Sequence, residues 1–225
     1  MTPGSEPAAT TGDSEPTRIK ICGVTRPDDA ARVAAAGIEF IGLNFWPTSK
    51  RYLAPEHAPA IAAAARAAGA TQLIGVFVDA RLDHIAAIAR DLRLDGIQLH
   101  GDETPEFAAA VAQRTGCPVW KAIALGGPDD LARLHGWSVD AILLDAPTPG
   151  RGGAGQVFDW RLAAQARSVH PGRRLLLAGG LGPDNVRAAI DAVAPWAVDV
   201  ASGVESAPGV KDPARLAAFV AAVRS

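Results

Sequence analysis

Short apolar runs alternate with alanine-rich helical runs along most of the chain, and this alternation restricts the fold more than any other feature. We predict strands at residues 18–22, 40–44, 72–78, 96–99, 119–124, 141–145, 175–178 and 197–201. Helices are predicted at residues 27–36, 55–68, 81–91, 105–115, 129–134, 160–166, 184–192 and 213–223. Strand–helix repetition with short connections produces right-handed βαβ units and a parallel sheet.

The number of predicted strands favours a closed barrel. About eight strands are what a (β/α)8 TIM barrel requires. A chain of 225 residues with 48% hydrophobic content can bury the core of one such domain. Two small domains and a doubly wound open sheet are the rival architectures. No G-x-G-x-x-G motif follows the first predicted strand, which argues against a dinucleotide site in an open sheet. We therefore predict one α/β catalytic domain, a (β/α)8 barrel over residues 18–225.

Residues 1–17 have a different composition, rich in Pro, Gly, Ser, Thr and Ala, with acidic but no basic side chains. A segment without apolar periodicity cannot bury enough surface to order itself, so we expect a flexible N-terminal tail. There is no secretory signal, and no apolar run approaches the roughly 18 residues that span a bilayer. The net charge of −2 offers no nucleic-acid surface. We expect a cytoplasmic protein with neither nucleic acid nor membrane as a partner.

Two predicted strands end in side chains that can transfer protons. Cys22 closes the first strand and Asp145 closes the sixth. Functional groups of such barrels gather where strands end, and a base with an acid is what an isomerase needs. A lone cysteine is more often a small core residue, but its place before Gly23 and a helix start favours a function. Cys117 precedes Pro118 at the start of a strand and would lie at the opposite rim, so we expect no disulfide.

Strand parity places several charged side chains inside the barrel. Lys20 shares the face of Cys22, and the same alternation turns Lys121 and Asp199 inward. An isolated buried charge costs several kcal/mol, so we predict an internal network of Lys20 and Lys121 with Asp199, with Asp145 as a further candidate member. The alternative is that these charges only balance one another. Lys20 could also lower the pKa of the Cys22 thiol from its usual value of about 8.5.

Two glycine-containing loops follow the last two predicted strands. Gly179 and Gly180 follow the seventh strand, and Ser202 and Gly203 follow the eighth. Loops at these positions commonly hold a phosphate, because glycine lets backbone N–H groups approach an anion closely. Tight strand–helix connections also need glycine, so the composition of one loop alone is weak evidence. The occurrence of both in the correct pair of loops predicts a phosphate site.

Two other connections have features of a substrate site. Arg51 follows two aromatic residues in the long connection after the second strand, and its forked donors suit a planar carboxylate. A solvated surface arginine is the alternative. The glycine-rich connection at residues 147–156 follows Asp145. It fits either a lid over the substrate or an exposed turn.

These residues occur in motifs that resemble the phosphoribosylanthranilate isomerase family over everything after the tail. The motifs follow one another in the family's order: KICG (20–23), SKRY (49–52), GVFV (75–78), QLHG (98–101), LLD (143–145), FDW (158–160), GGL (179–181) and VDVASGVE (198–205). No single motif is decisive, but their common register is specific. Ala201, where a second Ser is common, is a departure that we expect to change packing more than chemistry.

The resemblance implies an Amadori rearrangement in tryptophan biosynthesis, which converts N-(5-phosphoribosyl)anthranilate to 1-(2-carboxyphenylamino)-1-deoxyribulose 5-phosphate. It implies Cys22 as general base, Asp145 as general acid and Arg51 as the group that holds the anthranilate carboxylate. It also implies a phosphate on the two glycine loops and no cofactor or metal. We further expect Gln98 and His100, which parity turns inward, to contact the substrate.

Two alternative functions share some of these features. A bifunctional isomerase of histidine and tryptophan biosynthesis would typically have Asp where Cys22 stands, and the thiol argues against it. A non-catalytic phosphosugar-binding barrel would keep the glycine loops but could lose either proton-transfer group, and both groups are present. The sequence predicts a small-molecule phosphosugar partner and does not distinguish a monomer from a homodimer.

Overall fold

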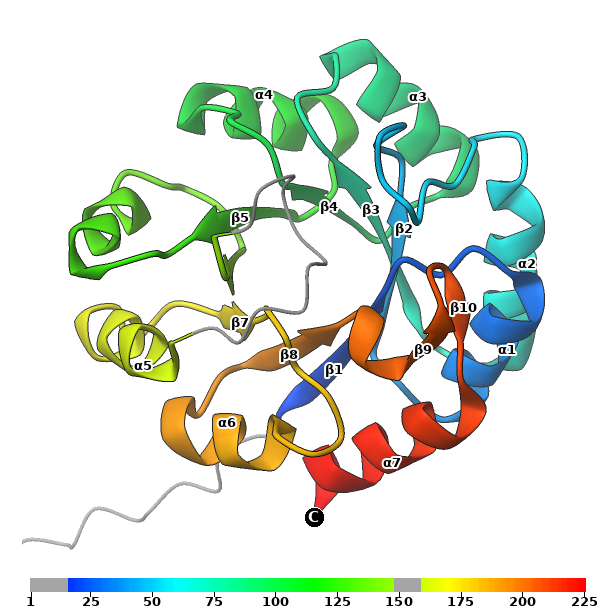
Figure 1. The fold of residues 1–225 in the computed structure, drawn as a ribbon. Helices are drawn as coiled ribbons and strands as arrows, with labels where there is room; N and C mark the ends of the chain where they lie inside the picture. Colours follow the sequence, from blue (N-terminus) through cyan, green and yellow to red (C-terminus); the bar gives the residue numbers. More distant parts are fainter. Residues whose placement is uncertain (1–15, 148–158) are drawn as a thin grey trace, which may run out of the picture.

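The computed structural model describes residues 16–147 and 159–225, in which parallel strands close into a ring with helices outside it (Figure 1). The barrel strands are β1 (Arg18–Cys22), β2 (Phe40–Asn44), β3 (Gln72–Phe77), β4 (Gly96–Leu99), β5 (Val119–Ala124), β6 (Ala141–Asp145), β7 (Leu175–Leu177) and β8 (Ala197–Val200). Each strand pairs with the next, and β8 pairs in parallel with β1. The predicted (β/α)8 barrel is confirmed, and the open sheet is excluded because the ring has no free edge.

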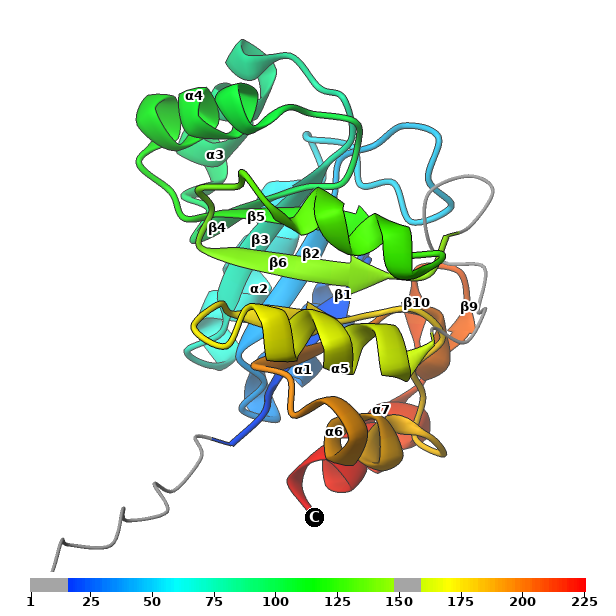
Figure 2. The ribbon, with the colours of Figure 1, turned by 90° about the vertical axis from the view of Figure 1, so that its left-hand side faces the viewer.

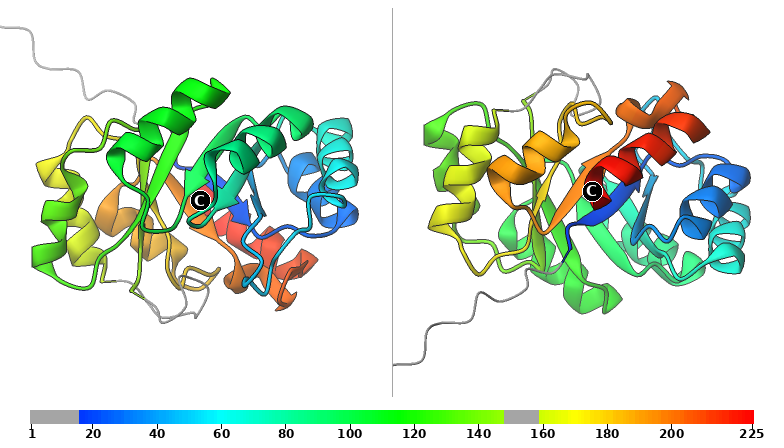
Figure 3. Two further views of the ribbon diagram at one scale, coloured as in Figure 1. Left: turned by 90° about the horizontal axis from the view of Figure 1, so that it is seen from above. Right: turned by 90° about the horizontal axis from the view of Figure 1, so that it is seen from below.

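Helices pack around the outside of the strands, as both views of Figure 3 show. They are α1 (Pro27–Ala35), α2 (Ala58–Ala68), α3 (Leu82–Leu92), α4 (Pro105–Thr115), α5 (Trp160–Val169), α6 (Val186–Val193) and α7 (Pro213–Arg224). The connection between β5 and β6 is a 3-10 helix, η1 (Pro128–Leu134), where the sequence predicted an α-helix at residues 129–134. The Asp130 carboxylate accepts hydrogen bonds from the backbone of Gly126 and Gly127, at 2.7 and 3.2 Å, which anchors this short segment at its start. Short runs gain little from α-helical propagation.

One helix begins later than predicted because its expected first turn serves the preceding loop. Helix α6 starts at Val186, whereas residue 184 was the predicted start. Asn185 uses its side chain on the glycine loop after β7: Oδ1 accepts from Gly182 N at 2.8 Å, and Nδ2 donates to the Gly180 carbonyl at 3.0 Å. Asn side chains often bond to neighbouring backbone groups in this way, in competition with the hydrogen bonds of a helix start. The local hydrogen bonds hold the loop that we expect to bind phosphate.

The core has two layers, one inside the barrel and one between the strands and the helices. The inner layer is closed at the N-terminal end of the barrel by aromatic rings. Trp120 meets Trp196 edge-on at 5.9 Å between ring centroids and meets Phe40 at 5.1 Å. Aromatic rings bury much surface in this arrangement. The floor of the barrel is therefore apolar, and the inward polar side chains lie above it.

A small hairpin lies between β8 and α7. It consists of β9 (Glu205–Ala207) and β10 (Val210–Lys211), preceded by the 3-10 turn η2 (Ser202–Val204). Figure 2 shows β9 and β10 at the end of the barrel toward which β6 points. The sequence did not predict this hairpin. Its position brings Glu205 and Lys211 to the end of the barrel where Cys22 and Asp145 lie.

The predicted tail of residues 1–17 lies outside the described residues except for its last two members. Of these, Thr17 donates a hydrogen bond to the Pro195 carbonyl at 3.4 Å. None of the helices in residues 16–147 and 159–225 combines the length and the apolar composition that a membrane-spanning helix needs.

Candidate active site

Cys22 shares the interior of the barrel with a buried ion pair. Lys20, which has no exposed surface, donates to Asp199 Oδ1 at 2.9 Å. A Cβ atom at Gly42 would lie 2.9 Å from the Cys22 sulfur and 3.0 Å from Lys20 Nζ, so the missing side chain at Gly42 leaves room for both groups. The predicted pairing of Lys20 with Asp199 is confirmed. It places a cation next to the thiol.

The pKa of the thiol is nevertheless raised. Burial raises the pKa of Cys22 above its ordinary value, Lys20 opposes this rise, and the Asp199 carboxylate adds to it. Lys20 acts in the expected direction, but the expectation that it brings the pKa of the thiol below its usual range is wrong because burial outweighs it. The ammonium itself stays charged. Burial acts to lower the pKa of Lys20, but Asp199 and the neighbouring sulfur outweigh it and raise that pKa.

Replacing Lys20 by Met tests this arrangement. Breaking a buried ion pair leaves Asp199 as an uncompensated charge, so the variant should lose about 3–5 kcal/mol of stability in denaturant unfolding. Loss of the cation should also raise the pKa of Cys22 further, seen as a shift to higher pH in the rate of thiol alkylation. Cys117 is replaced by Ser in both proteins so that only Cys22 reacts. A variant that matches the parent in stability and in alkylation would refute the role of Lys20.

A matched double variant separates the cost of the unpaired Asp199 charge from the loss of Lys20 itself. In the double variant with Lys20→Met and Asp199→Asn, the orphaned carboxylate is gone. Part of the lost stability should then return, because a neutral amide is cheaper to bury than an unpaired charge.

Lys121 does not join this network, which corrects the prediction from strand parity. It faces outward from β5, where its ammonium donates to Glu103 Oε2 at 2.8 Å and to the Gly101 carbonyl at 2.6 Å. Its strand neighbours Trp120 and Ala122 belong to the inner layer of the core. A buried lysine was expected to face the polar interior. The connection after β4 provides the Glu103 carboxylate outside the barrel, so the Lys121 ammonium is paired on the outer face of β5 as well as it would be inside.

Asp145 lies at the end of β6 and contacts His100 rather than a lysine. Its Oδ1 atom accepts a hydrogen bond from Ala146 N at 2.8 Å, and its Oδ2 atom lies 3.4 Å from His100 Nε2. His100 Nδ1 in turn lies 2.8 Å from the amide nitrogen of Gln98. Gln98 has no exposed surface, and its Oε1 atom finds no hydrogen-bond partner among the described residues. Gln98 thus reaches the site through His100.

The two predicted phosphate loops lie against each other. The backbone of Gly203 touches that of Leu181 so closely that any side chain at Gly203 would collide with the Leu181 carbonyl. Gly180, Ser202 and Gly203 line one cavity of about 690 Å³, together with Asn185 and Arg215. The cavity thus brings together three of the four residues that the sequence assigned to a phosphate, whereas Gly179 lies against Ala146 and Asp145. Binding of the phosphate itself stays a prediction.

Arg51 lies beside Cys22, but a partner that the sequence did not predict holds it. Its guanidinium donates to Glu205 at distances between 2.7 and 3.1 Å, and Glu205 also accepts from Lys211 Nζ at 2.7 Å. Lys211 donates to the Cys22 carbonyl at 2.6 Å. Sequence reasoning missed Glu205 and Lys211 as site residues. The only available signal was a carboxylate directly after the second glycine loop.

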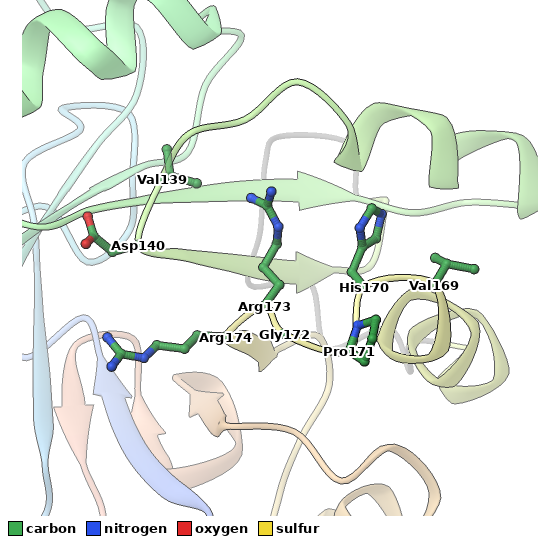
Figure 4. Close-up of a pocket in the computed structure, with 8 residues that line it drawn as sticks. All are labelled: Val139, Asp140, Val169, His170, Pro171, Gly172, Arg173 and Arg174. Atoms are coloured by element: carbon green, nitrogen blue, oxygen red, sulfur yellow. The ribbon is translucent and has the colours of Figure 1, made fainter.

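Other candidate features do not add to this site. The connection at residues 147–156, interpreted from the sequence as either a lid or an exposed turn, lies outside the described residues except for Pro147. A cavity of about 530 Å³ lies at the opposite end of the barrel, before β6 and β7 (Figure 4). Its Arg173 and Arg174 side chains point in different directions, so its polar groups do not converge on a ligand.

The described residues contain no group of three or more His, Cys, Asp or Glu side chains that could hold a metal ion. Both cysteines are free, as expected.

Comparisons with known proteins agree with one family. The family model of N-(5'-phosphoribosyl)anthranilate (PRA) isomerase matches residues 19–222. A relative of that name from Myxococcus xanthus is 45% identical over 212 residues, which cover 92% of this chain and 96% of the relative. Another from Ralstonia nicotianae is 43% identical and covers 92% of this chain and 93% of its own.

Solved structures give the same result. The crystal structure of phosphoribosyl anthranilate isomerase from Thermotoga maritima is similar with a TM-score of 0.83 and 39% identity, covering 92% of this chain and 98% of that one. A structure of such an isomerase in complex with reduced 1-(o-carboxyphenylamino)-1-deoxyribulose 5-phosphate has a TM-score of 0.79 and 37% identity, with the same coverage. Because sequence, fold and family model agree over nearly the whole barrel, the chain belongs to the N-(5'-phosphoribosyl)anthranilate isomerase family.

Proposed function

We propose that the barrel of residues 18–225 converts N-(5-phosphoribosyl)anthranilate to 1-(2-carboxyphenylamino)-1-deoxyribulose 5-phosphate in tryptophan biosynthesis. The observation that carries the proposal is the placement of Cys22 and Asp145. They end β1 and β6, with β7 and β8 between these strands in the ring. A thiol and a carboxyl group at the same end of the barrel can act as the base and the acid of one reaction. The activity in the names of the relatives supports the same reaction.

The substrate is proposed to lie across the C-terminal end of the barrel. Its phosphate would accept hydrogen bonds from the loops of Gly179, Gly180, Ser202 and Gly203. Its anthranilate carboxylate would face Arg51, which lies against Gly23, directly after Cys22. Anchors at both ends hold the ribose between the thiol and the carboxyl group, which reduces the entropy cost of reaching the reactive geometry.

Ring opening is the first chemical step. Protonated Asp145 donates its proton to the ribose ring oxygen as the bond from C1 to that oxygen breaks. The lone pair of the anthranilate nitrogen forms the new C1=N bond, so the product of this step is an open-chain iminium ion. Asp145 is then a carboxylate.

Proton abstraction is the second step. The Cys22 thiolate removes the proton from C2, the C2–H electrons form a C1=C2 bond, and the C=N electrons return to nitrogen. The resulting enolamine tautomerises to the ketone. The iminium charge also explains how a thiol with a raised pKa can act as a base. A positive charge next to the sulfur favours the thiolate, in the same direction as Lys20.

Gln98 and His100 are proposed to serve both protonation states of Asp145. When the Gln98 amide nitrogen donates to Nδ1, a neutral His100 carries its proton on Nε2, which faces the Asp145 carboxylate. When the amide is reversed, the unpaired Oε1 atom accepts from Nδ1–H, and Nε2 presents a lone pair to protonated Asp145. Gln98 and His100 can thus provide a hydrogen-bond partner for Asp145 in both of its protonation states. The earlier expectation that both residues contact the substrate remains a prediction.

A fluorescence assay tests the proposed function. Freshly made N-(5-phosphoribosyl)anthranilate is mixed with the purified full chain, and the anthranilate-type fluorescence is followed. We expect it to fall with a rate proportional to the protein concentration. A sample without protein measures spontaneous breakdown. A decay no faster than in that sample would reject the activity and leave a phosphosugar-binding barrel.

Replacing Arg51 by Ala tests the proposed carboxylate site. Loss of a charge-assisted hydrogen bond should raise KM about tenfold or more, with a smaller change in kcat, because the carboxylate is bound equally in the substrate and the transition state. Steady-state kinetics over a range of substrate concentrations separate the two constants. An unchanged KM would reject the assignment of Arg51.

A further inference from the structure

Glu205 and Arg51 form a buried pair that joins two distant parts of the chain at the mouth of the barrel. The Arg51 Nε atom lies 2.9 and 3.1 Å from the two Glu205 oxygens, and Nη2 lies 2.7 Å from Oε2. The side chains of Arg51 and Glu205 are only 12% and 4% exposed. Planar, two-point pairing of this kind fixes the direction of a guanidinium as well as its position.

Among the described residues, the pairing leaves one edge of the guanidinium without a hydrogen-bond partner. Glu205 takes the Nε–H group and one N–H of Nη2. The Nη1 group and the second N–H of Nη2 form the remaining edge, which has the donor spacing that a second carboxylate needs. The aliphatic part of Arg51 is fixed too. It lies against Gly23, where a Cβ atom would collide with Arg51 Cδ and where φ is +69°. The free edge is therefore held in one orientation.

Lys211 is the third member of the cluster, and its ammonium has three hydrogen-bond acceptors. Its ammonium, with no exposed surface, lies 2.7 Å from Glu205 Oε1, 2.6 Å from the Cys22 carbonyl and 3.4 Å from the Ala201 carbonyl. Burial alone would raise the pKa of Glu205, but Arg51 and Lys211 outweigh burial and lower it, so Glu205 is ionised at neutral pH. The hydrogen bond to Glu205 raises the pKa of Arg51, whereas burial lowers the pKa of Lys211 in spite of Glu205. Arg51 is therefore the member of the cluster whose positive charge faces a substrate carboxylate.

We propose that Glu205 is a positioning residue that aims the free edge of Arg51 at the ortho carboxylate of the substrate and so sets the preference for carboxylated arylamine phosphosugars. This inference rests on the proposed function, because it assigns the partner of Arg51 within that site. Lys211 links the cluster to the backbone of Cys22, so the carboxylate site and the base share one support. Glu205 does not touch the substrate in this account.

The preference is measured with two stable probes. One is the reduced product analogue, 1-(2-carboxyphenylamino)-1-deoxyribitol 5-phosphate, and the other is the same compound without the carboxylate. Calorimetric titration of the full chain gives both Kd values. The ratio used below is the Kd of the probe without the carboxylate divided by the Kd of the carboxylated probe. For Glu205→Gln we expect this ratio to fall about 10- to 100-fold, which is the loss of one charge-assisted hydrogen bond. The Kd of the probe without a carboxylate should change less than about threefold.

The direction of the change distinguishes positioning from simple charge. Removing the negative charge of Glu205 makes the cluster more positive, and by Coulomb attraction alone it would strengthen binding of the carboxylated probe. A ratio that rises or stays the same would overturn the proposal. Glu205→Asp keeps the charge but shortens the side chain, so it protects folding if the amide variant is unstable. It should also lower the ratio, and a ratio equal to that of the parent would overturn the proposal as well.

A control separates this inference from general destabilisation and from the proposed function. Glu103→Gln breaks a different buried carboxylate–lysine pair, in which Lys121 lies 2.8 Å from Glu103, and it should leave the ratio unchanged. Arg51→Ala should abolish the preference for the carboxylated probe. If it does and the Glu205 variants do not, the positioning role alone is wrong. If Arg51→Ala also leaves the ratio intact, the proposed carboxylate site is wrong.

Discussion

Replacing Cys22 by Ala is expected to lower kcat at least about a hundredfold while the barrel stays folded. A positioned general base contributes about 10²- to 10⁴-fold to rate. Removal of the sulfur leaves no group at the end of β1 to take the proton from C2. Cys22 is a small, partly buried side chain at the edge of the core, so its truncation should cost little stability. The fluorescence assay gives kcat, and thermal unfolding confirms the fold.

Two further variants make this result specific to the thiolate. Cys22→Ser keeps the size but has a hydroxyl that does not ionise near neutral pH, so it should be as slow as Cys22→Ala. Cys117→Ala removes the other free cysteine, which precedes β5 at the opposite end of the barrel, and should leave kcat unchanged. Activity of Cys22→Ser within about tenfold of the parent would mean that the sulfur is not the base.

Replacing Asp145 by Asn should also lower kcat at least about a hundredfold, by removal of the proton donor for ring opening. The local structure should survive the change. The Asn side-chain oxygen can accept the hydrogen bond that Ala146 N now donates to Oδ1 at 2.8 Å. The amide cannot donate a proton to the ring oxygen and then carry the charge. The loss should appear in kcat and kcat/KM together, as expected for an interaction made only in the transition state.

Asp140→Asn is the matched control for this variant. Asp140 immediately precedes the same strand, and its carboxylate accepts from Val119 N at 2.8 Å at the opposite end of the barrel. The same chemical change should there leave kcat unaltered. An Asp145→Asn protein with kcat within about threefold of the parent would contradict a general-acid role, since even weak acid catalysis is worth more than that.

The strand ends and one ion pair of the site were predictable from local pattern. Apolar runs ending in Cys22 and Asp145 predicted where two side chains meet the end of a barrel, because parallel strands all end at one face. Alternation along β1 and β8 predicted that Lys20 and Asp199 share the interior, and their Nζ and Oδ1 atoms lie 2.9 Å apart. These inferences needed only the two-residue period of a strand.

The remaining contacts depend on chain segments that no local pattern relates. Lys121 was placed on the wrong face of β5 because parity does not say which face is inward, and its partner Glu103 comes from a connection whose path the sequence does not give. Arg51 and Glu205 are 154 positions apart in the chain. Their pairing exists only because the ring closes and brings the hairpin after β8 next to the connection after β2. The raised pKa of Cys22 likewise follows from burial, which the sequence alone does not quantify.

A crystal structure of this protein with the reduced product analogue would locate Cys22 and Asp145 relative to the sugar. We expect the Cys22 sulfur about 3–3.5 Å from the former C2 position, on one side of the sugar chain. We expect an Asp145 oxygen within about 2.6–3.2 Å of the oxygen that closed the ribose ring, on the other side. A complex in which the sulfur and the carboxyl group lie on the same side of the sugar, or in which packed side chains separate either one from it, would contradict the mechanism.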